Sequence, residues 1–164
     1  MKVREKKKRK SIVKVKVNAR DKRTNSGEIR EEEKMLKELE WEDPFLGVGT
    51  PPCNFMSQIL NIMKNKMAPQ RREELRATGR RYLQTACAAY MSQIRRGKYF
   101  LHEHPWGAES WQEDCVREVA AQPGVRIVKG PQCKYHLQGY DRYGNHGFIR
   151  KYTGFITNLP ELAD

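Results

Sequence analysis

The sequence has no long hydrophobic run and few cysteines for its length. No apolar stretch approaches the roughly 20 residues that a membrane-spanning helix requires. The charged N-terminus is not followed by the apolar region of a secretory signal. The four cysteines are widely spaced and form no Cys-x-x-Cys pair, so we expect free thiols. The sequence therefore predicts no membrane partner and no cysteine-rich zinc module.

Acidic residues are scarce at the start of the chain. Residues 1–30 contain thirteen Lys or Arg against three Asp or Glu, whereas residues 31–164 contain nineteen against seventeen. The net charge of +12 therefore belongs mainly to the N-terminal segment. The segment contains a compact run of basic residues, namely Lys6, Lys7, Lys8, Arg9 and Lys10. Such a run is typical of nuclear import or of contact with nucleic-acid phosphates. It predicts nuclear localisation, with the cytoplasm as the alternative.

A chain of 164 residues predicts one folded domain. Residues 1–27 are predicted to be a basic, disordered tail and linker, and residues 28–164 an α/β domain. Inside the tail, Val13 and Val15 alternate with lysines, a pattern typical of a strand. This segment is expected either to add an edge strand to a sheet or to stay extended.

Hydrophobic periodicity predicts a βαβ unit in the first half of the domain. A helix is expected over Glu28–Glu40, followed by a buried strand at Phe45–Val48. Pro69 suits the first turn of a long helix that ends near Arg96, and Lys98–His102 is the next strand. A strand, a helix and a strand in this order imply parallel pairing and a right-handed crossover.

The second half becomes richer in β-structure. Ser110 and Glu113 match a capping box, which predicts the start of a short helix. A strand is expected at Val125–Val128, a hairpin around residues 141–146 and a last strand at Gly154–Thr157. The predicted fold class is thus a mostly parallel α/β sheet, flanked by helices, with a β-rich C-terminal part.

A cysteine and a glutamate follow the two predicted parallel strands. Pro51 and Pro52 form a stiff turn that fixes the position of Cys53 after the first strand. Glu103 lies at the end of the second strand. Because ligands collect at the carboxyl ends of parallel strands, both residues are expected to face one pocket. A buried structural cysteine is the alternative interpretation of Cys53.

Histidines near this edge leave two further alternatives open. His102 and His104 flank Glu103, and a neutral imidazole beside Cys53 would suit a Cys–His hydrolase. Alternation along a strand, however, points both histidines away from the side that Glu103 occupies. Cys133 and His136 have a spacing typical of metal ligands, so a structural zinc site is the second alternative.

Several motifs resemble one enzyme family. Thr-Pro-Pro-Cys-Asn-Phe-Met-Ser at residues 50–57 resembles the proline-cysteine motif of DNA cytosine-5 methyltransferases. Tyr-Phe-Leu-His-Glu-His-Pro at residues 99–105 resembles the Glu-Asn-Val motif of that family. The segment 151–158 is similar to the terminal Lys-Pro-Thr-x-Phe-x-Thr-Asn of eukaryotic methyltransferase-like segments, some of them associated with retroelements. The resemblance covers about residues 40–164.

The resemblance implies a fold, a chemistry and a cofactor. The fold would be the second half of a Rossmann-like methyltransferase. Cys53 would add to C6 of a flipped cytosine, and Glu103 would hydrogen-bond the N3/N4 edge of the base. The methyl group would come from S-adenosylmethionine, and DNA is favoured over RNA as the substrate. The segment after Cys53, up to Ala68, would be the catalytic loop.

The sequence also departs from this family. Asn54 replaces a glutamine, and His104-Pro105 replaces Asn-Val. Residues 1–43 contain no glycine-rich strand–turn–helix for the cofactor, so a separate N-terminal cofactor-binding half is expected as a partner. Amino-methyltransferases of nucleic acid are a poorer match, because Thr50 and Cys53 replace their acidic or amide residue and their aromatic residue. The alternative function is a non-catalytic nucleic-acid-binding module derived from a mobile element, which binds through its basic tail.

Overall fold

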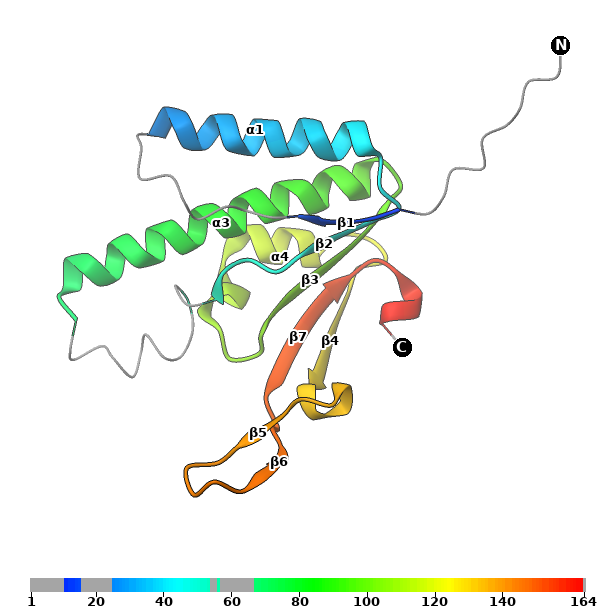
Figure 1. Ribbon diagram of the computed structural model, residues 1–164. Helices are drawn as coiled ribbons and strands as arrows, with labels where there is room; N and C mark the ends of the chain where they lie inside the picture. The colour runs from blue at the N-terminus through cyan, green and yellow to red at the C-terminus, as the bar shows by residue number, and fades with distance from the viewer. Residues whose placement is uncertain (1–10, 16–24, 54–55, 57–66, 164) are drawn as a thin grey trace, which may run out of the picture.

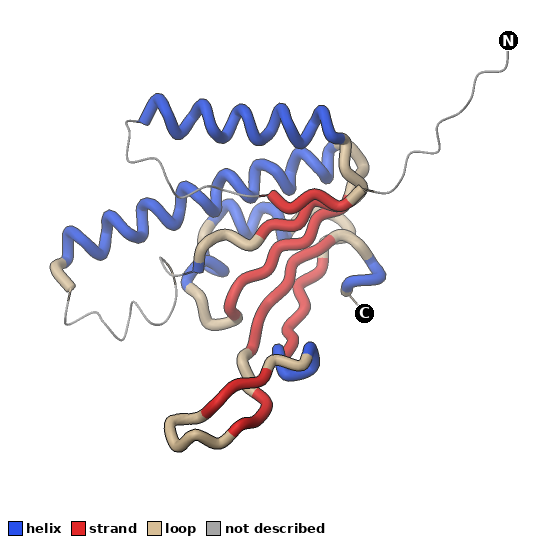
Figure 2. The backbone as a smooth tube through the Cα atoms, in the orientation of Figure 1, coloured by secondary structure: helices blue, strands red, loops and turns tan. Residues whose placement is uncertain are grey.

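The computed structural model describes residues 11–15, 25–53, 56 and 67–163, which form a mixed α/β fold (Figure 1). Its centre is a mixed sheet of five strands. In spatial order these are β1 (Ile12–Val15), β2 (Leu46–Gly49), β3 (Tyr99–Pro105), β7 (Tyr152–Thr157) and β4 (Arg126–Pro131). A second, two-stranded sheet consists of β5 (Gln138–Tyr140) and β6 (His146–Phe148), and projects from the first as a hairpin (Figures 1 and 2).

Three helices lie together on one side of the five-stranded sheet (Figure 1). They are α1 (Asn25–Glu42), α3 (Pro69–Arg95) and α4 (Asp114–Ala120). Short 3-10 helices occur at η3 (Glu109–Gln112), η4 (Gln132–Tyr135) and η5 (Pro160–Leu162). Within the described part of the chain, no helix combines the length and the apolar character needed to cross a membrane.

The predicted βαβ unit is confirmed, but the mostly parallel sheet is not. β2 pairs in parallel with β3 and β1 pairs in parallel with β2, whereas β7 is antiparallel to both β3 and β4. The difference arises after β4. The β5–β6 hairpin reverses the chain there, and β7 then returns between β3 and β4 instead of pairing at an edge. Local periodicity identifies strands but contains no information on this order.

The N-terminal strand pattern is confirmed as an edge strand. β1 lies at the end of the sheet order, although it falls within residues 1–27, which were predicted to be a tail and linker. α1 begins at Asn25, three residues before the predicted start, and α3 matches its predicted bounds to within one residue. The four residues of β1 form a parallel ladder with β2. The hydrogen bonds of this ladder explain why such a short, lysine-containing segment can join the sheet.

The core lies between the sheet and α3. Residues of β3 alternate between full and partial burial, and Phe100 is completely buried. Phe100 stacks on Tyr90 of α3, with 4.9 Å between ring centroids. Leu83 and Ala86 of α3 and Ile156 of β7 complete this buried layer. Because the helices cover only one face, β3 residues that point to the other face remain half-buried.

The predicted capping box at Ser110 and Glu113 is wrong. Residues 109–112 form the 3-10 helix η3, and α4 begins only at Asp114 without a side-chain cap. Ser110 is fully buried, with its hydroxyl 2.5 Å from Nδ1 of His104. Glu113 accepts a hydrogen bond from Arg80 Nε at 3.1 Å. Both side chains therefore find tertiary partners that satisfy them better than the local backbone does.

Candidate functional site

The parallel register places the carboxyl end of β2 beside the middle of β3. β3 continues to Pro105, so Glu103 lies inside this strand and not at its end as predicted. Gly49, the last residue of β2, is paired with His102 of β3. Glu103 is the next residue of β3, and Cys53 follows β2 after the Thr50-Pro51-Pro52 turn. The structure thus brings Cys53 and Glu103 to the same edge of the sheet. The Cys53 thiol is half-buried and forms no disulfide.

Glu103 projects from the face of the sheet that α3 does not cover. One of its carboxylate oxygens accepts a hydrogen bond from the Thr153 hydroxyl of β7. Its cross-strand partner is Phe155, which packs edge-on against Tyr135 with 6.4 Å between ring centroids. Sequence reasoning missed both neighbours, because β7 lies some fifty residues further along the chain. The carboxylate is therefore held by Thr153, in a strand position opposite Phe155.

His102 and His104 point to the opposite, helix-covered face, as strand alternation predicts. They are 1% and 2% exposed, and their rings stack at 5.7 Å between centroids. His102 Nδ1 lies 3.1 Å from the Tyr90 hydroxyl. Burial is the main cause that lowers the pKa of His102 to about 3 and that of His104 to about 4. Both imidazoles are neutral at neutral pH.

The turn that carries Cys53 is anchored over this helix-covered face. The backbone of Pro51 interacts with the His104 ring, which partly opposes the lowering of the His104 pKa. Met56 is 3% exposed and belongs to the same core as α3. Its N–H donates to the Cys53 carbonyl at 3.1 Å, and its carbonyl accepts from the Glu109 N–H at 3.0 Å. The bond to the Cys53 carbonyl and the buried, hydrogen-bonded Met56 thus hold this turn at the sheet edge.

S-adenosylmethionine would need a glycine-rich turn where backbone amides can approach it closely. The glycines of β2 lie against α3 instead. A Cβ on Gly47 would lie 3.4 Å from the Gln93 side chain, and one on Gly49 would lie 1.9 Å from the Tyr90 hydroxyl oxygen. Gly49 therefore allows α3 to pack closely on β2, whereas a Cβ on Gly47 would make only an ordinary contact. The described residues do not form a cradle that fits this cofactor.

The β5–β6 hairpin and its flanks expose aromatic rings among basic residues. Tyr140 is 75% exposed, Tyr143 73% and Phe148 64%. Residues 129–152 contain five Lys or Arg and one acid, Asp141. Arg142 lies over the ring of Tyr143, with 4.6 Å from its guanidinium carbon to the ring centroid. We call residues 138–152 the hairpin surface. The signal for it was present in the sequence as basic residues interleaved with tyrosines.

The turn of the hairpin is held by one carboxylate. Asp141 accepts hydrogen bonds from the backbone N–H groups of Tyr143 and Asn145 at 2.8 and 2.9 Å, and from the Asn145 side chain at 3.0 Å. These bonds, led by the one from the Asn145 side chain, lower the pKa of Asp141. Gly144 completes the turn with a φ of 85°. The tyrosines on either side are therefore presented by an ordered turn.

Basic residues continue from the hairpin to the carboxyl edge of β3. Lys129 Nζ lies 4.9 Å from the ring centroid of Trp106 and 4.6 Å from that of Tyr152. Arg150 also lies over the Tyr152 ring, with 5.3 Å from its guanidinium carbon to the ring centroid. Trp106 directly follows β3, and its N–H donates to the Tyr152 carbonyl at 3.2 Å. The hairpin surface is therefore continuous with the carboxyl end of β3, on the face of His104 and not on that of Glu103.

Three other sequence predictions meet the structure in different ways. The basic run from Lys6 to Lys10 lies outside the described residues, as does most of the loop between Cys53 and Ala68. Among the described residues, no three His, Cys, Asp or Glu side chains are grouped so as to hold a metal ion.

Comparisons with protein-family models, with curated proteins and with solved structures find no match for this chain.

Proposed function

We propose that this chain is a nucleic-acid-binding α/β module that carries Cys53 and Glu103, the residues that match the cytosine-5 methyltransferase motifs, at one edge of its sheet. The observation that carries the proposal is the hairpin surface, where exposed tyrosines alternate with cations next to the carboxyl end of β3. Stacking of bases on aromatic rings, combined with a positive groove for phosphates, is how proteins bind single-stranded nucleic acid.

The arrangement of the edge supports contact with a base. The Glu103 carboxylate can accept hydrogen bonds from the amino group of an unpaired cytosine, and Phe155 lies opposite it on β7. Such contacts require a base that has left the stack or that was never paired. The proposed ligand is therefore single-stranded or flippable nucleic acid that contains cytosine, with DNA favoured over RNA.

The half-buried thiol of Cys53 gives the proposal its second, catalytic part. A thiolate that adds to C6 of a pyrimidine forms one S–C bond, and the electron pair of the ring double bond moves to position 5, where it takes a proton. This addition needs no cofactor. S-adenosylmethionine, which the resemblance implies, would be held by a separate cofactor-binding half, and no step of this proposal depends on methyl transfer.

Replacement of Tyr140 and Tyr143 by alanine should weaken binding of a single-stranded, cytosine-containing oligonucleotide by at least about tenfold, because each lost stack costs about 1–3 kcal/mol. Fluorescence anisotropy at several salt concentrations measures this effect. A separate variant, Arg150→Gln with Lys151→Gln, should reduce the salt dependence by about two phosphate contacts. Arg117→Gln on α4, an exposed cation on the helix side, is the control for loss of charge alone.

A deletion of residues 1–10 tests the basic tail separately and leaves β1 in place. We expect it to lower affinity mainly at low salt, because the tail can contribute phosphate contacts but has no aromatic ring for stacking. If the deletion removed all binding while the double tyrosine variant bound like the wild type, the tail alone would be the interface.

The catalytic part predicts a covalent adduct with an oligonucleotide that contains 5-azacytosine. The wild-type chain should form a complex that survives denaturing electrophoresis, and Cys53→Ser should form none, because serine is a far weaker nucleophile. Glu103→Gln should slow adduct formation about 100-fold. Cys133→Ser, which alters another half-buried thiol, should react like the wild type. An adduct that persists in Cys53→Ser would refute this part and leave the binding module intact.

A further inference from the structure

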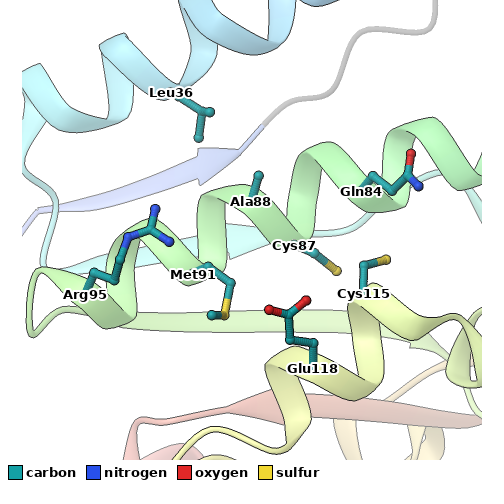
Figure 3. A pocket seen from close by; sticks show the side chains of 8 residues that line it. All are labelled: Leu36, Gln84, Cys87, Ala88, Met91, Arg95, Cys115 and Glu118. Carbon is teal, nitrogen blue, oxygen red and sulfur yellow. The ribbon is translucent and has the colours of Figure 1, made fainter.

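A cavity lies between α1, α3 and α4, on the side of α3 away from the sheet (Figure 3). Its volume is about 320 Å³. The residues that line it are Leu36, Gln84, Cys87, Ala88, Met91, Arg95, Cys115 and Glu118. Two of these are cysteines from different helices, and neither takes part in the proposed nucleic-acid site.

The two thiols meet at the wall of this cavity. Cys87 of α3 is 4% exposed and Cys115 of α4 is half-buried, and their side chains lie next to one another (Figure 3). Hydrogen bonding between the two thiols is the largest cause of the pKa shift of each. Because twenty-seven residues separate them in the sequence, this contact is a tertiary feature that sequence spacing did not indicate.

The hydrogen bond makes the two thiols chemically different. The bond from Cys87 lowers the pKa of Cys115, against the opposing effects of burial and of the Glu113 charge. The same bond, together with burial and the charges of Cys115 and Glu118, raises the pKa of Cys87. Cys115 is therefore the residue that ionises, and Cys87 is the donor that stabilises its thiolate.

We propose that Cys87 and Cys115 form a dithiol site that exchanges with low-molecular-weight disulfides admitted by this cavity. In the first step, the Cys115 thiolate attacks one sulfur of the incoming disulfide, and a small thiolate leaves. In the second step, Cys87 loses its proton and attacks the Cys115 sulfur, which releases the second small thiolate. One external disulfide becomes two thiols, and the protein gains one disulfide between α3 and α4.

The structure provides a reason for the second step. The contact with the Cys115 thiolate is the largest cause that keeps Cys87 protonated. Once Cys115 is part of a mixed disulfide, it carries no negative charge and no longer accepts that hydrogen bond. Cys87 then ionises more readily, next to the sulfur that it must attack. Glu118, which also faces the cavity, can accept the proton that Cys87 releases (Figure 3).

To test this, the full chain is oxidised by glutathione disulfide in glutathione buffers that contain increasing proportions of the disulfide. Oxygen is excluded, so that glutathione disulfide is the only oxidant. Alkylation, trypsin digestion and mass spectrometry then separate all four cysteines, because they fall in different peptides: residues 38–64, 82–95, 99–117 and 130–134. We expect a disulfide-linked product of peptides 82–95 and 99–117. We also expect alkylation of Cys115 in the reduced protein to be at least about tenfold faster than that of Cys87.

Variants assign the order of the steps. Cys87→Ala should stop at a glutathione adduct on Cys115, and Cys115→Ser should give neither the adduct nor the linked product. Cys133→Ser should give the linked product as the wild type does. The proposal is overturned if the wild-type chain gives no 82–95/99–117 product at any buffer ratio. It is equally overturned if the linked product contains Cys53 or Cys133 instead, or if the glutathione adduct on Cys115 is never released in the wild type.

Discussion

Lowering the pH from 7 to 5 should destabilise this protein by about 4 kcal/mol through His102 and His104 alone. The pKa of His102 in the folded protein is about 3 and that of His104 about 4, whereas an unfolded histidine has a pKa near 6.5. Both rings are buried against Tyr90, Ser110 and each other, and the Nε2 atoms of both have no hydrogen-bond partner among the described residues.

The sign of the effect follows from proton uptake. Between pH 6.5 and pH 4, the unfolded chain binds a proton on each ring and the folded chain does not, so acid favours unfolding. The stabilisation is fully present above pH 6.5 and is lost as the pH falls toward the folded-state values. Near pH 5 the slope is about 2.5 kcal/mol per pH unit for the two rings together. A typical domain has only about 5–15 kcal/mol of stability in total.

Urea unfolding at a series of pH values, followed by circular dichroism, measures this slope. His102→Asn and His104→Asn each keep an acceptor near the position of Nδ1, and each should remove about half of the slope below pH 6.5. His146→Asn, in the exposed strand β6, should leave the slope as it is in the wild type. A double His102/His104 variant with the wild-type slope would contradict this account, whatever its absolute stability.

Gly49→Ala should cost about 3 kcal/mol of stability and displace the turn that carries Cys53. The new Cβ would lie 1.9 Å from the Tyr90 hydroxyl oxygen and 2.7 Å from its Cζ, closer than non-bonded atoms can approach. Tyr90 cannot move aside easily, because it is 1% exposed, stacks on Phe100 and is hydrogen-bonded to His102. Either α3 must shift away from β2 or the end of β2 must bend.

Thermal and urea unfolding of paired variants tests this contact. Gly147→Ala in β6 is the control, because no atom lies within 4 Å of the position that its Cβ would take. This substitution should change the stability of the protein by less than about 0.5 kcal/mol. In a Tyr90→Phe background, Gly49→Ala should cost less, because the closest atom has been removed. Equal costs in both backgrounds would mean that the Tyr90 hydroxyl does not limit the approach of α3.

The sequence predicted the elements that depend on near neighbours in the chain. α3 follows from Pro69 at its start and from apolar residues at helical spacing, and its observed end lies one residue from the predicted end. The hairpin follows from a turn-forming segment between two short strands. Alternation along β3 correctly placed His102 and His104 on the face opposite Glu103. Each of these patterns is set by bonds and contacts within a few residues.

The errors occurred where a side chain had a distant partner. Ser110 and Glu113 have the sequence of a capping box, but His104 and Arg80 take their polar groups. The expectation of a mostly parallel sheet failed because β7 returns between β3 and β4. Nothing in the local pattern distinguishes a strand that is inserted between two others from one that is added at an edge.

The sequence by itself determined that Cys53 follows a stiff Pro-Pro turn at the end of one strand. It predicted Glu103 at the end of the next strand, whereas β3 continues to Pro105. Only the tertiary structure decided what surrounds them. The register of β2 on β3 brings the two residues to one edge, Thr153 from β7 holds the carboxylate, and close packing against Tyr90 requires a glycine at position 49. These contacts join residues that lie some forty to fifty positions apart, and their formation depends on how the whole sheet closes against α3.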